Sequence, residues 1–151
     1  MTVTASDGVL TTIVSFSIDI FNTAPFLQTK FPKKHLVQLT KEITLVVPNI
    51  LDKEYNPVSI SFTGFPPFIT YNPILSQIQA KPTNPATDLG VFRIKGLLSD
   101  SHMTTEFSFT VEVFNKPPTM KGSLQDQTVF YEIPSTYTIP NIEDEEGLKI
   151  K

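Results

Sequence analysis

The side chains best suited to chemistry in this sequence are carboxylates and amides in short polar segments between apolar runs. Asp52, Glu54 and Asn56 lie in one such segment, and Asn22 and Asp100 lie in two others. Carboxylate and amide oxygens are ligands that calcium takes in proteins, about six to eight at a time with backbone carbonyls and water. The same residue types also form the hydrogen bonds of ordinary solvated turns. The choice between these roles depends on the elements that position the side chains.

The composition gives little support to other kinds of chemistry. The chain has no cysteine and two histidines, His35 and His102, which excludes thiol, disulfide and zinc-finger chemistry and leaves little for imidazole-dependent catalysis. A net charge of -3 argues against a nucleic-acid partner. No apolar run approaches the roughly 18 residues of a membrane span, so we expect no membrane insertion. Residues 143–146 are interpreted as a solvated acidic loop, because no partner base for acid-base catalysis is indicated.

The sequence repeats itself at an interval of about 93 residues. Residues 6–25 and 99–118 share nine of twenty positions without a gap, and the segment PNILDKE at 48–54 returns as PNIEDEE at 140–146. On this register we expect three parts. Residues 1–22 are the last strands of one repeat, residues 23–115 are one complete repeat, and residues 116–151 are the first strands of the next.

Apolar residues alternate with polar ones along much of the complete repeat. Phe107, Phe109, Val111 and Val113 alternate with hydrophilic residues, the pattern of a strand with one face in a core. Residues 102–115 therefore form one predicted strand. Six more are predicted at residues 36–39, 43–47, 58–62, 68–71, 77–80 and 90–97. Seven short strands separated by Asn-Pro turns predict an all-β fold, an Ig-like or cadherin-like seven-stranded β-sandwich repeated in tandem.

Four segments of the complete repeat resemble the cadherin-like repeats of dystroglycan type and the related Ig-like repeats of very large surface proteins. They are FNTAPFL at 21–27, DKEYNPVSISF at 52–62, GFPPFITYN at 64–72 and KPTNPATDLGVFRIKGLLSDS at 81–101. The resemblance implies an extracellular or cell-surface protein used in adhesion or scaffolding, without catalytic activity. It also implies that its partners are neighbouring repeats of the same chain, together with other copies or surface proteins met laterally or end to end.

Two features depart from the cadherin pattern. Cadherins have an Asp-x-Asn-Asp-Asn linker between repeats, whereas this chain has Asp-Ile-Phe-Asn at 19–22 and Glu-Val-Phe-Asn at 112–115, so much of the linker carboxylate is missing. Gly96 lies within the strand predicted at 90–97. A glycine in a strand interior predicts a bulge or a close approach of the backbone to another group.

The sandwich topology groups the acidic segments at the two ends of the complete repeat. At the first junction we expect four residues, joined by Asn56, to lie close together: Asn22, Asp52, Glu54 and Asp100. At the second junction we expect Asp88, Asn115, Asp144 and Glu146 to face one another. Each set is a possible though incomplete calcium site, and the alternative that these are ordinary turn acids stays open.

Two functions fit these expectations. In the first, the repeats join end to end through short proline-containing linkers and form an extracellular stalk or filament. In the second, the segment is a spacer or ligand-binding module of a secreted enzyme or a cell-surface receptor. Lys30, Lys33 and Lys34 are compatible with contact to an anionic glycan, but the interpretation we favour is a charged edge that prevents sheet-to-sheet association.

Overall fold

The computed structural model describes residues 1–150, and within that range the regular elements are all β-strands. Lys151, the last residue of the third expected segment, lies outside the described residues. The described residues include no helix that is long and apolar enough to span a membrane. The strands are β1 (Thr2–Ser6), β2 (Thr11–Ser15), β3 (Phe26–Leu27), β4 (Lys34–Gln38), β5 (Ile43–Val46), β6 (Ile50–Leu51), β7 (Ser59–Thr63), β8 (Ile69–Asn72), β9 (Gln77–Ala80), β10 (Gly90–Ser99), β11 (Thr104–Phe114), β12 (Thr119–Met120) and β13 (Ile142–Glu143).

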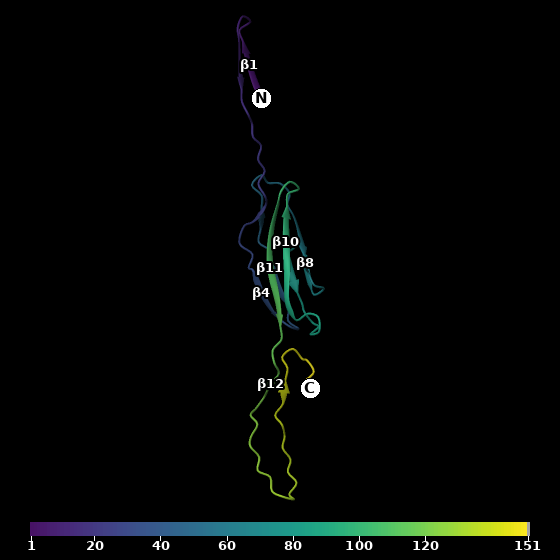
Figure 1. Cartoon of the computed structure of the whole chain (residues 1–151). Coiled ribbons are helices and arrows are strands. Elements are labelled where there is room, and N and C mark those ends of the chain that lie inside the picture. Colours follow the sequence, from purple (N-terminus) through teal and green to yellow (C-terminus); the bar gives the residue numbers. More distant parts are fainter. Residues whose placement is uncertain (151) are drawn as a thin grey trace.

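The central part of the chain is a sandwich of two facing sheets. One sheet has the order β4-β11-β10-β7, with β4 parallel to β11 and the other pairs antiparallel. The facing sheet has the order β5-β9-β8, and the short strands β3 and β6 pair beside it. Figure 1 shows this sandwich at the middle of an elongated molecule, with β1 beyond one end and β12 beyond the other.

The predicted all-β sandwich is confirmed, and each of the seven predicted strands is present within two residues of its expected limits. The sequence did not indicate β3 and β6, which are two residues long and pair only with each other. Gly96 does not form a bulge, because the β10–β11 ladder is continuous from Gly90 to Ser99. The ring of Phe107 instead lies directly over Gly96, where an added Cβ atom would be 2.3 Å from the ring.

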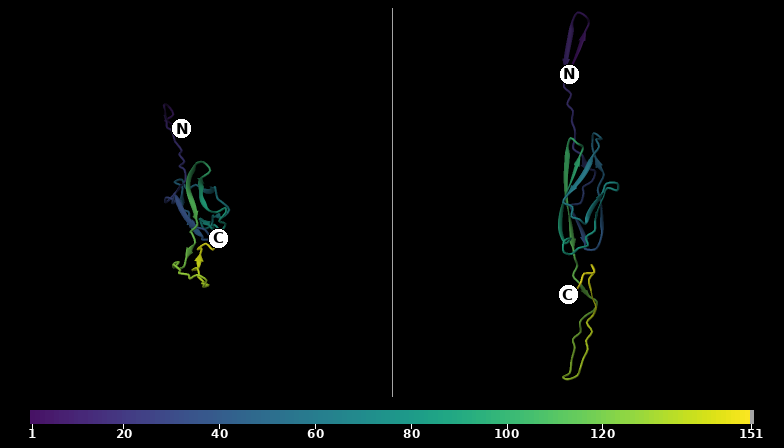
Figure 2. Two further views of the ribbon diagram at one scale, coloured as in Figure 1. Left: turned by 60° about the horizontal axis from the view of Figure 1, so that its bottom comes forward. Right: turned by 90° about the vertical axis from the view of Figure 1, so that its right-hand side faces the viewer.

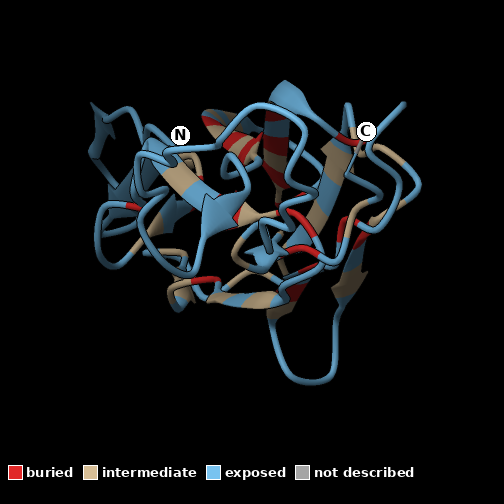
Figure 3. Ribbon diagram, turned by 90° about the horizontal axis from the view of Figure 1, so that it is seen from below, coloured by how far each residue is buried: buried red, intermediate tan, exposed pale blue. Residues whose placement is uncertain are grey.

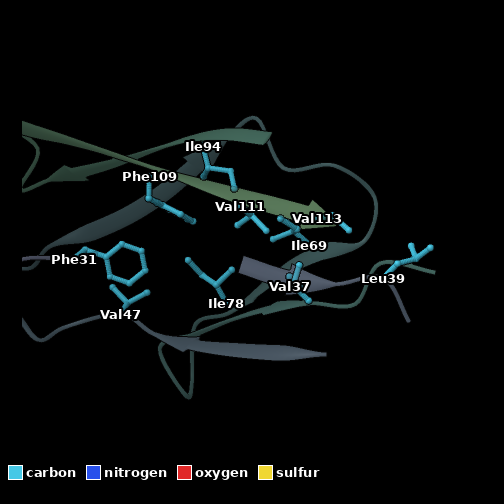
Figure 4. Close-up of a cluster of buried hydrophobic side chains, with 11 residues drawn as sticks. Phe31, Val37, Leu39, Val47, Ile69, Ile78, Ile94, Phe109, Val111 and Val113 are labelled. Atoms are coloured by element: carbon cyan, nitrogen blue, oxygen red, sulfur yellow. The ribbon is translucent and has the colours of Figure 1, made fainter. Parts of the chain in front are cut away.

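The core lies between the two sheets and follows the expected alternation. Ile94 and Leu98 of β10, and Phe109 and Val111 of β11, are at most 2 % exposed. Ile78 of β9 supplies a fully buried side chain from the facing sheet. Figure 4 shows Ile78, Ile94, Phe109 and Val111 packed with Val37 of β4 and Ile69 of β8. Burying so much branched and aromatic surface is the main favourable term in the folding of this sandwich.

The two ends of the chain reproduce pairings of the central sandwich. The β1–β2 hairpin pairs Thr2 with Ser15, and the β10–β11 hairpin pairs Lys95 with Ser108, which is the same register after a shift of 93 residues. Likewise, β12–β13 pairs residues 119 and 143, as β3–β6 pairs residues 26 and 51. Figure 2 shows the two terminal segments extending from opposite ends of the sandwich. The internal repeat is therefore a repeat of backbone structure as well as of sequence.

The apolar face of the terminal hairpin is exposed, although its counterpart in the sandwich is buried. Phe16 has 44 % of its surface exposed, whereas Phe109, at the equivalent position, has 2 %. Val129 and Ile139 near the other end are also exposed. Figure 3, seen along the molecule, shows buried residues as bands on the central strands. The difference arises because no described strand packs against the inward face of β2.

His35 of β4 is a half-buried titratable group that packs against the core of the sandwich. Its ring lies 5.3 Å from Phe31 and 5.7 Å from Phe109, between ring centroids, and its Nε2 atom is buried without a hydrogen-bond partner. Burial lowers the pKa of His35 below its usual 6.5, although a hydrogen bond with the Pro32 backbone partly opposes this shift. The neutral ring is therefore the form that the fold stabilises.

We expect the free energy of unfolding to be highest above about pH 6.5 and to fall as the pH drops through the lowered pKa of His35. Because one proton is taken up on unfolding, the slope is at most about 1.4 kcal/mol per pH unit. Urea unfolding between pH 5 and 8 measures it. The His35→Phe variant should lose this dependence while keeping the aromatic contacts, and an unchanged slope in that variant would assign the dependence to other groups.

Candidate functional site: the two junctions

Asn22 joins the terminal hairpin to the central sandwich at the first junction. Its Nδ2 atom donates to Asp100 Oδ2 at 2.8 Å, and its Oδ1 atom accepts a hydrogen bond from Asn56 Nδ2 at 2.9 Å. Asp100 lies in the loop between β10 and β11, and Asn56 lies in the loop between β6 and β7. The structure therefore brings together residues from three segments that the sandwich topology placed at this end.

Asp52 organises the loop that carries Asn56. Its Oδ1 atom accepts hydrogen bonds from the backbone N–H groups of Glu54 at 3.0 Å and Asn56 at 2.9 Å. Tyr55 adopts a φ of 61°, in the left-handed region, where this turn reverses. The other carboxylate oxygen, Oδ2, is buried without a hydrogen-bond partner. Asp52 thus forms a turn, as one interpretation expected, and its second carboxylate oxygen has no hydrogen-bond partner.

Glu54 binds Thr23, the first residue of the segment 23–115. Its Oε2 atom accepts hydrogen bonds from Thr23 Oγ1 at 2.7 Å and from the Thr23 backbone N–H at 3.2 Å. The hydroxyl hydrogen bond is the largest cause that lowers the pKa of Glu54, so the carboxylate is ionised at neutral pH. Thr23 was not predicted as a site residue, although it directly follows Asn22 in the sequence.

Asp100 is almost completely buried, with 3 % of its surface exposed. Its Oδ1 atom accepts hydrogen bonds from the backbone N–H groups of Met103 at 2.6 Å and His102 at 2.8 Å. The Met103 hydrogen bond, followed by that of the Asn22 side chain, holds the pKa of Asp100 below its usual range. A buried carboxylate that stays ionised needs such donors, and here they come from its own turn and from the linker.

At the second junction, Glu146 occupies the position that Glu54 has at the first. Its Oε1 atom accepts hydrogen bonds from Gln38 Nε2 at 2.6 Å and from the Lys116 backbone N–H at 3.1 Å. Its Oε2 atom is buried without a hydrogen-bond partner. Leu148 packs against the core of the sandwich. Gln38 lies at the end of β4, far away in sequence, so no sequence signal connected it with Glu146.

The turn before Glu146 repeats the turn of Asp52. The Oδ1 atom of Asp144 accepts hydrogen bonds from the backbone N–H groups of Glu146 at 3.1 Å and Leu148 at 2.8 Å. Gly147, with a φ of 73°, takes the position of Tyr55. In both junctions the glutamate two residues after the turn aspartate binds the backbone N–H of the residue that follows the linker asparagine.

Asp88 and Asn115, also predicted for the second junction, make their hydrogen bonds locally. Asp88 accepts from the backbone N–H groups of Thr83 and Asn84, at 2.8 and 2.9 Å, and from Thr87 Oγ1 at 2.7 Å. Burial would raise the pKa of Asp88, but these hydrogen bonds outweigh it and lower the pKa. Asn115 Nδ2 donates to the Lys116 carbonyl. No hydrogen bond in the described structure joins either residue to Asp144 or Glu146.

Asp52 and Glu146 each have one buried carboxylate oxygen without a hydrogen-bond partner, and these are the oxygens that a cation could use. Within residues 1–150, no three His, Cys, Asp or Glu side chains lie close enough together to hold a metal ion by themselves. At the first junction, however, Asp52 Oδ2 is a buried carboxylate oxygen without a hydrogen-bond partner, in a loop hydrogen-bonded to Asn22. Amide oxygens, backbone carbonyls and water would have to complete the six to eight oxygens that calcium takes.

Comparison with known proteins gives similarity in structure and not in sequence. No protein-family model matches the chain, and no curated protein sequence matches it. A two-domain structure of human protocadherin-24 matches with a TM-score of 0.51 at 14% identity, covering 83% of this chain and 61% of that chain. An endo-fucoidan hydrolase of glycoside hydrolase family 107 matches with a TM-score of 0.49 at 15% identity, and the match covers 80% of this chain and 20% of the hydrolase. The immunoglobulin domains of Sidekick-1 match with a TM-score of 0.47 at 10% identity, and the match covers 66% of this chain and 21% of that chain.

The chain therefore spans a fifth of the hydrolase and less than two thirds of the protocadherin structure. The chain has an all-β sandwich fold similar to that of cadherin domains.

Proposed function

We propose that this chain is a non-catalytic structural segment of an extracellular tandem-repeat protein, built from cadherin-like repeats of dystroglycan type. Residues 1–22, 23–115 and 116–151 belong to three successive repeats, which interlock into a stiff stalk or filament with adhesive contacts to other surface proteins. The observation that carries the proposal is the recurrence of one hydrogen-bonded junction, through Glu54 at one end of the sandwich and Glu146 at the other.

The chemistry of the junction supports a mechanical role. The carboxylates of Glu54 and Glu146 are engaged with backbone N–H groups of the linkers, and Asn22 binds side chains of two loops at once. Lys116 also forms an ion pair with Glu145 at 2.7 Å, and the hydrogen bond in this pair raises the pKa of Lys116. Such contacts oppose bending between neighbouring repeats. The extracellular location is supported by the four segments that resemble surface-protein repeats and by the cadherin-type fold.

Calcium at the first junction is part of the proposal. Asp52, through its free Oδ2, would hold the ion together with Asn22, Glu54 and Asp100. At the second junction Asp144 and Glu146 would do so without Asp88 and Asn115, whose hydrogen bonds are local. Bound calcium would neutralise the carboxylates and tie two repeats together. With so few carboxylates, the expected affinity is that of weak extracellular sites, on the order of 10⁻⁴ to 10⁻³ M.

Replacing Asn22 by aspartate tests the junction and the calcium site together. The variant keeps the size of the side chain but removes the N–H donor, so in chelator a second carboxylate faces Asp100 where the hydrogen bond was 2.8 Å long. We expect small-angle X-ray scattering in chelator to show a broader range of shapes for Asn22→Asp than for the unmodified chain. Adding calcium at a few millimolar should restore the narrow, elongated distribution.

Asn115→Asp is the matched control, because Asn115 donates only to the neighbouring carbonyl of Lys116. It should change the scattering much less. If Asn22→Asp scatters like the unmodified chain in chelator, the hydrogen-bonded junction does not stiffen the molecule and the mechanical proposal fails. If the variant loosens but calcium has no effect on it or on the unmodified chain, only the calcium part of the proposal is wrong.

A further inference from the structure

Four basic side chains that form no ion pair in the described structure gather on one side of the sandwich. Lys30 and Lys33 lie in the segment that crosses from β3 to β4, and Arg93 and Lys95 lie on β10. Arg93 is the single arginine of the chain. The net charge of the whole chain is -3, so this positively charged surface differs in sign from the chain as a whole.

Two adjoining hollows lie between these basic residues. The first has a volume of about 350 Å³ and lies between the crossing segment and β11, and the second has a volume of about 320 Å³ and lies over β10 and β11. Lys33 and Ser108 line both hollows, so the two adjoin, and together we call them the basic groove. No acidic residue is among the described residues that line it.

The strand register fixes how the basic side chains are presented. Arg93 and Lys95 occupy exposed positions of β10, because Ile94 between them points into the core. They lie opposite Thr110 and Ser108 of β11, whose hydroxyls face the same side. Cations and hydroxyls therefore alternate across a rigid outer surface and need no rearrangement to meet a ligand.

Lys33 is held in place by β11. Its carbonyl accepts hydrogen bonds from the Thr110 backbone N–H at 2.9 Å and from Thr110 Oγ1 at 3.2 Å. This contact begins the parallel pairing of β4 with β11, which extends from Thr110 to Phe114. Before Thr110, the edge of β11 is bordered by the crossing segment, which lines the first hollow together with Thr105 and Phe107. Lys33 is thus fixed at the point where the two hollows meet.

The geometry points to an anionic glycan, bearing sulfate or carboxylate groups, as the ligand of the basic groove. A glycan chain offers repeated anionic groups to Lys30, Lys33, Arg93 and Lys95, and hydroxyls to Ser108 and Thr110. Arginine and lysine are the side chains that bind such oxyanions, and arginine does so in a bidentate manner. Only part of the groove could be predicted from the sequence, because Arg93 and Lys95 are about 60 residues away from Lys30 and Lys33.

Other polyanions fit the groove less well. An acidic peptide that binds as an added strand on the edge of β11 before Thr110 would lie in the first hollow, whereas Arg93 and Lys95 line only the second. A single-stranded nucleic acid needs exposed aromatic rings on which bases stack, whereas Phe31, in the floor of the first hollow, is only 8 % exposed. The glycan alone requires what the groove presents, which is spaced cations and hydroxyls at the surface.

Binding of dextran sulfate to the full chain, measured by isothermal titration calorimetry at several salt concentrations, tests the proposal. We expect binding that weakens as salt rises, and no binding of unsulfated dextran. The Arg93→Gln/Lys95→Gln variant should bind about tenfold more weakly, since each exposed charge contact contributes roughly half of the 1.4 kcal/mol that equals a factor of ten. Both residues are exposed, so circular dichroism should show an unchanged fold.

The matched control is Lys53→Gln/Lys149→Gln, which removes the same charge at exposed positions outside the groove. This control should lose less than about twofold in affinity. An equal loss in the two variants would overturn the proposal, because net charge alone would then explain binding. So would the absence of dextran sulfate binding, or binding of polyglutamate at equal affinity that the Arg93→Gln/Lys95→Gln change abolishes, which would identify an acidic protein as the partner.

Discussion

Replacing Gly96 by valine is expected to destabilise the central sandwich by about 2 to 3 kcal/mol, the upper part of the range for overpacked cores. The reason is steric. A Cβ atom at Gly96 would lie 2.3 Å from the Phe107 ring, and the ring itself packs against Phe31 and Phe62, with centroids 5.9 and 6.1 Å apart. The ring therefore has little room to move aside. Urea unfolding of the variant and of the unmodified chain measures the difference.

A pair of residues in the terminal hairpin shows how this clash can be avoided. At the equivalent position of the terminal hairpin, the pair Gly96–Phe107 is replaced by Val3–Val14, with the same register. Phe107→Val alone should also destabilise the sandwich, since it uncovers Gly96. The double variant Gly96→Val/Phe107→Val should therefore be more stable than the sum of the two single effects predicts, by at least about 1 kcal/mol. Strict additivity would show that the ring and the glycine do not act as a pair.

Features that depend on local sequence pattern were predictable. Alternation predicted β10 and β11 well, because Phe109, Val111 and Val113 face one core over a long ladder. The strands β3 and β6 escaped prediction since two-residue pairings leave no alternation to detect. Gly96 was correctly marked as unusual, but the sequence could not distinguish a bulge from a covering ring, which is contributed by the partner strand.

The candidate site was predictable to the extent that topology alone places loops. Asn22, Asp100 and Asn56 are distant in sequence, yet the order of strands in a sandwich brings their loops to one end, where hydrogen bonds join them. The pairing of Gln38 with Glu146 was not predictable, because it depends on where the end of β4 meets the following segment. The basic groove was likewise hidden, since its members come from two strands and a crossing segment.

Replacing Phe109 by alanine should have the largest effect of any single change considered, a loss of about 3 to 5 kcal/mol of unfolding free energy. Phe109 is 2 % exposed, and its ring lies against those of Phe31 and His35, with centroids 4.9 and 5.7 Å away. Removing the ring leaves a cavity that neighbouring β-sheets cannot readily close. Phe16→Ala is the matched control, since Phe16 is the equivalent residue in the terminal hairpin but is 44 % exposed.

In the 151-residue chain, Phe16→Ala should change the unfolding free energy by less than about 0.5 kcal/mol, as surface substitutions usually do. The same change should cost about as much as Phe109→Ala in a longer protein in which a second copy of residues 23–93 precedes residue 1. There the strands equivalent to β4 and β9 would cover Phe16 as they cover Phe109. If Phe16→Ala remains neutral in that protein, the hairpin of residues 2–15 is not the end of a preceding repeat, and the tandem array that we propose loses its structural basis.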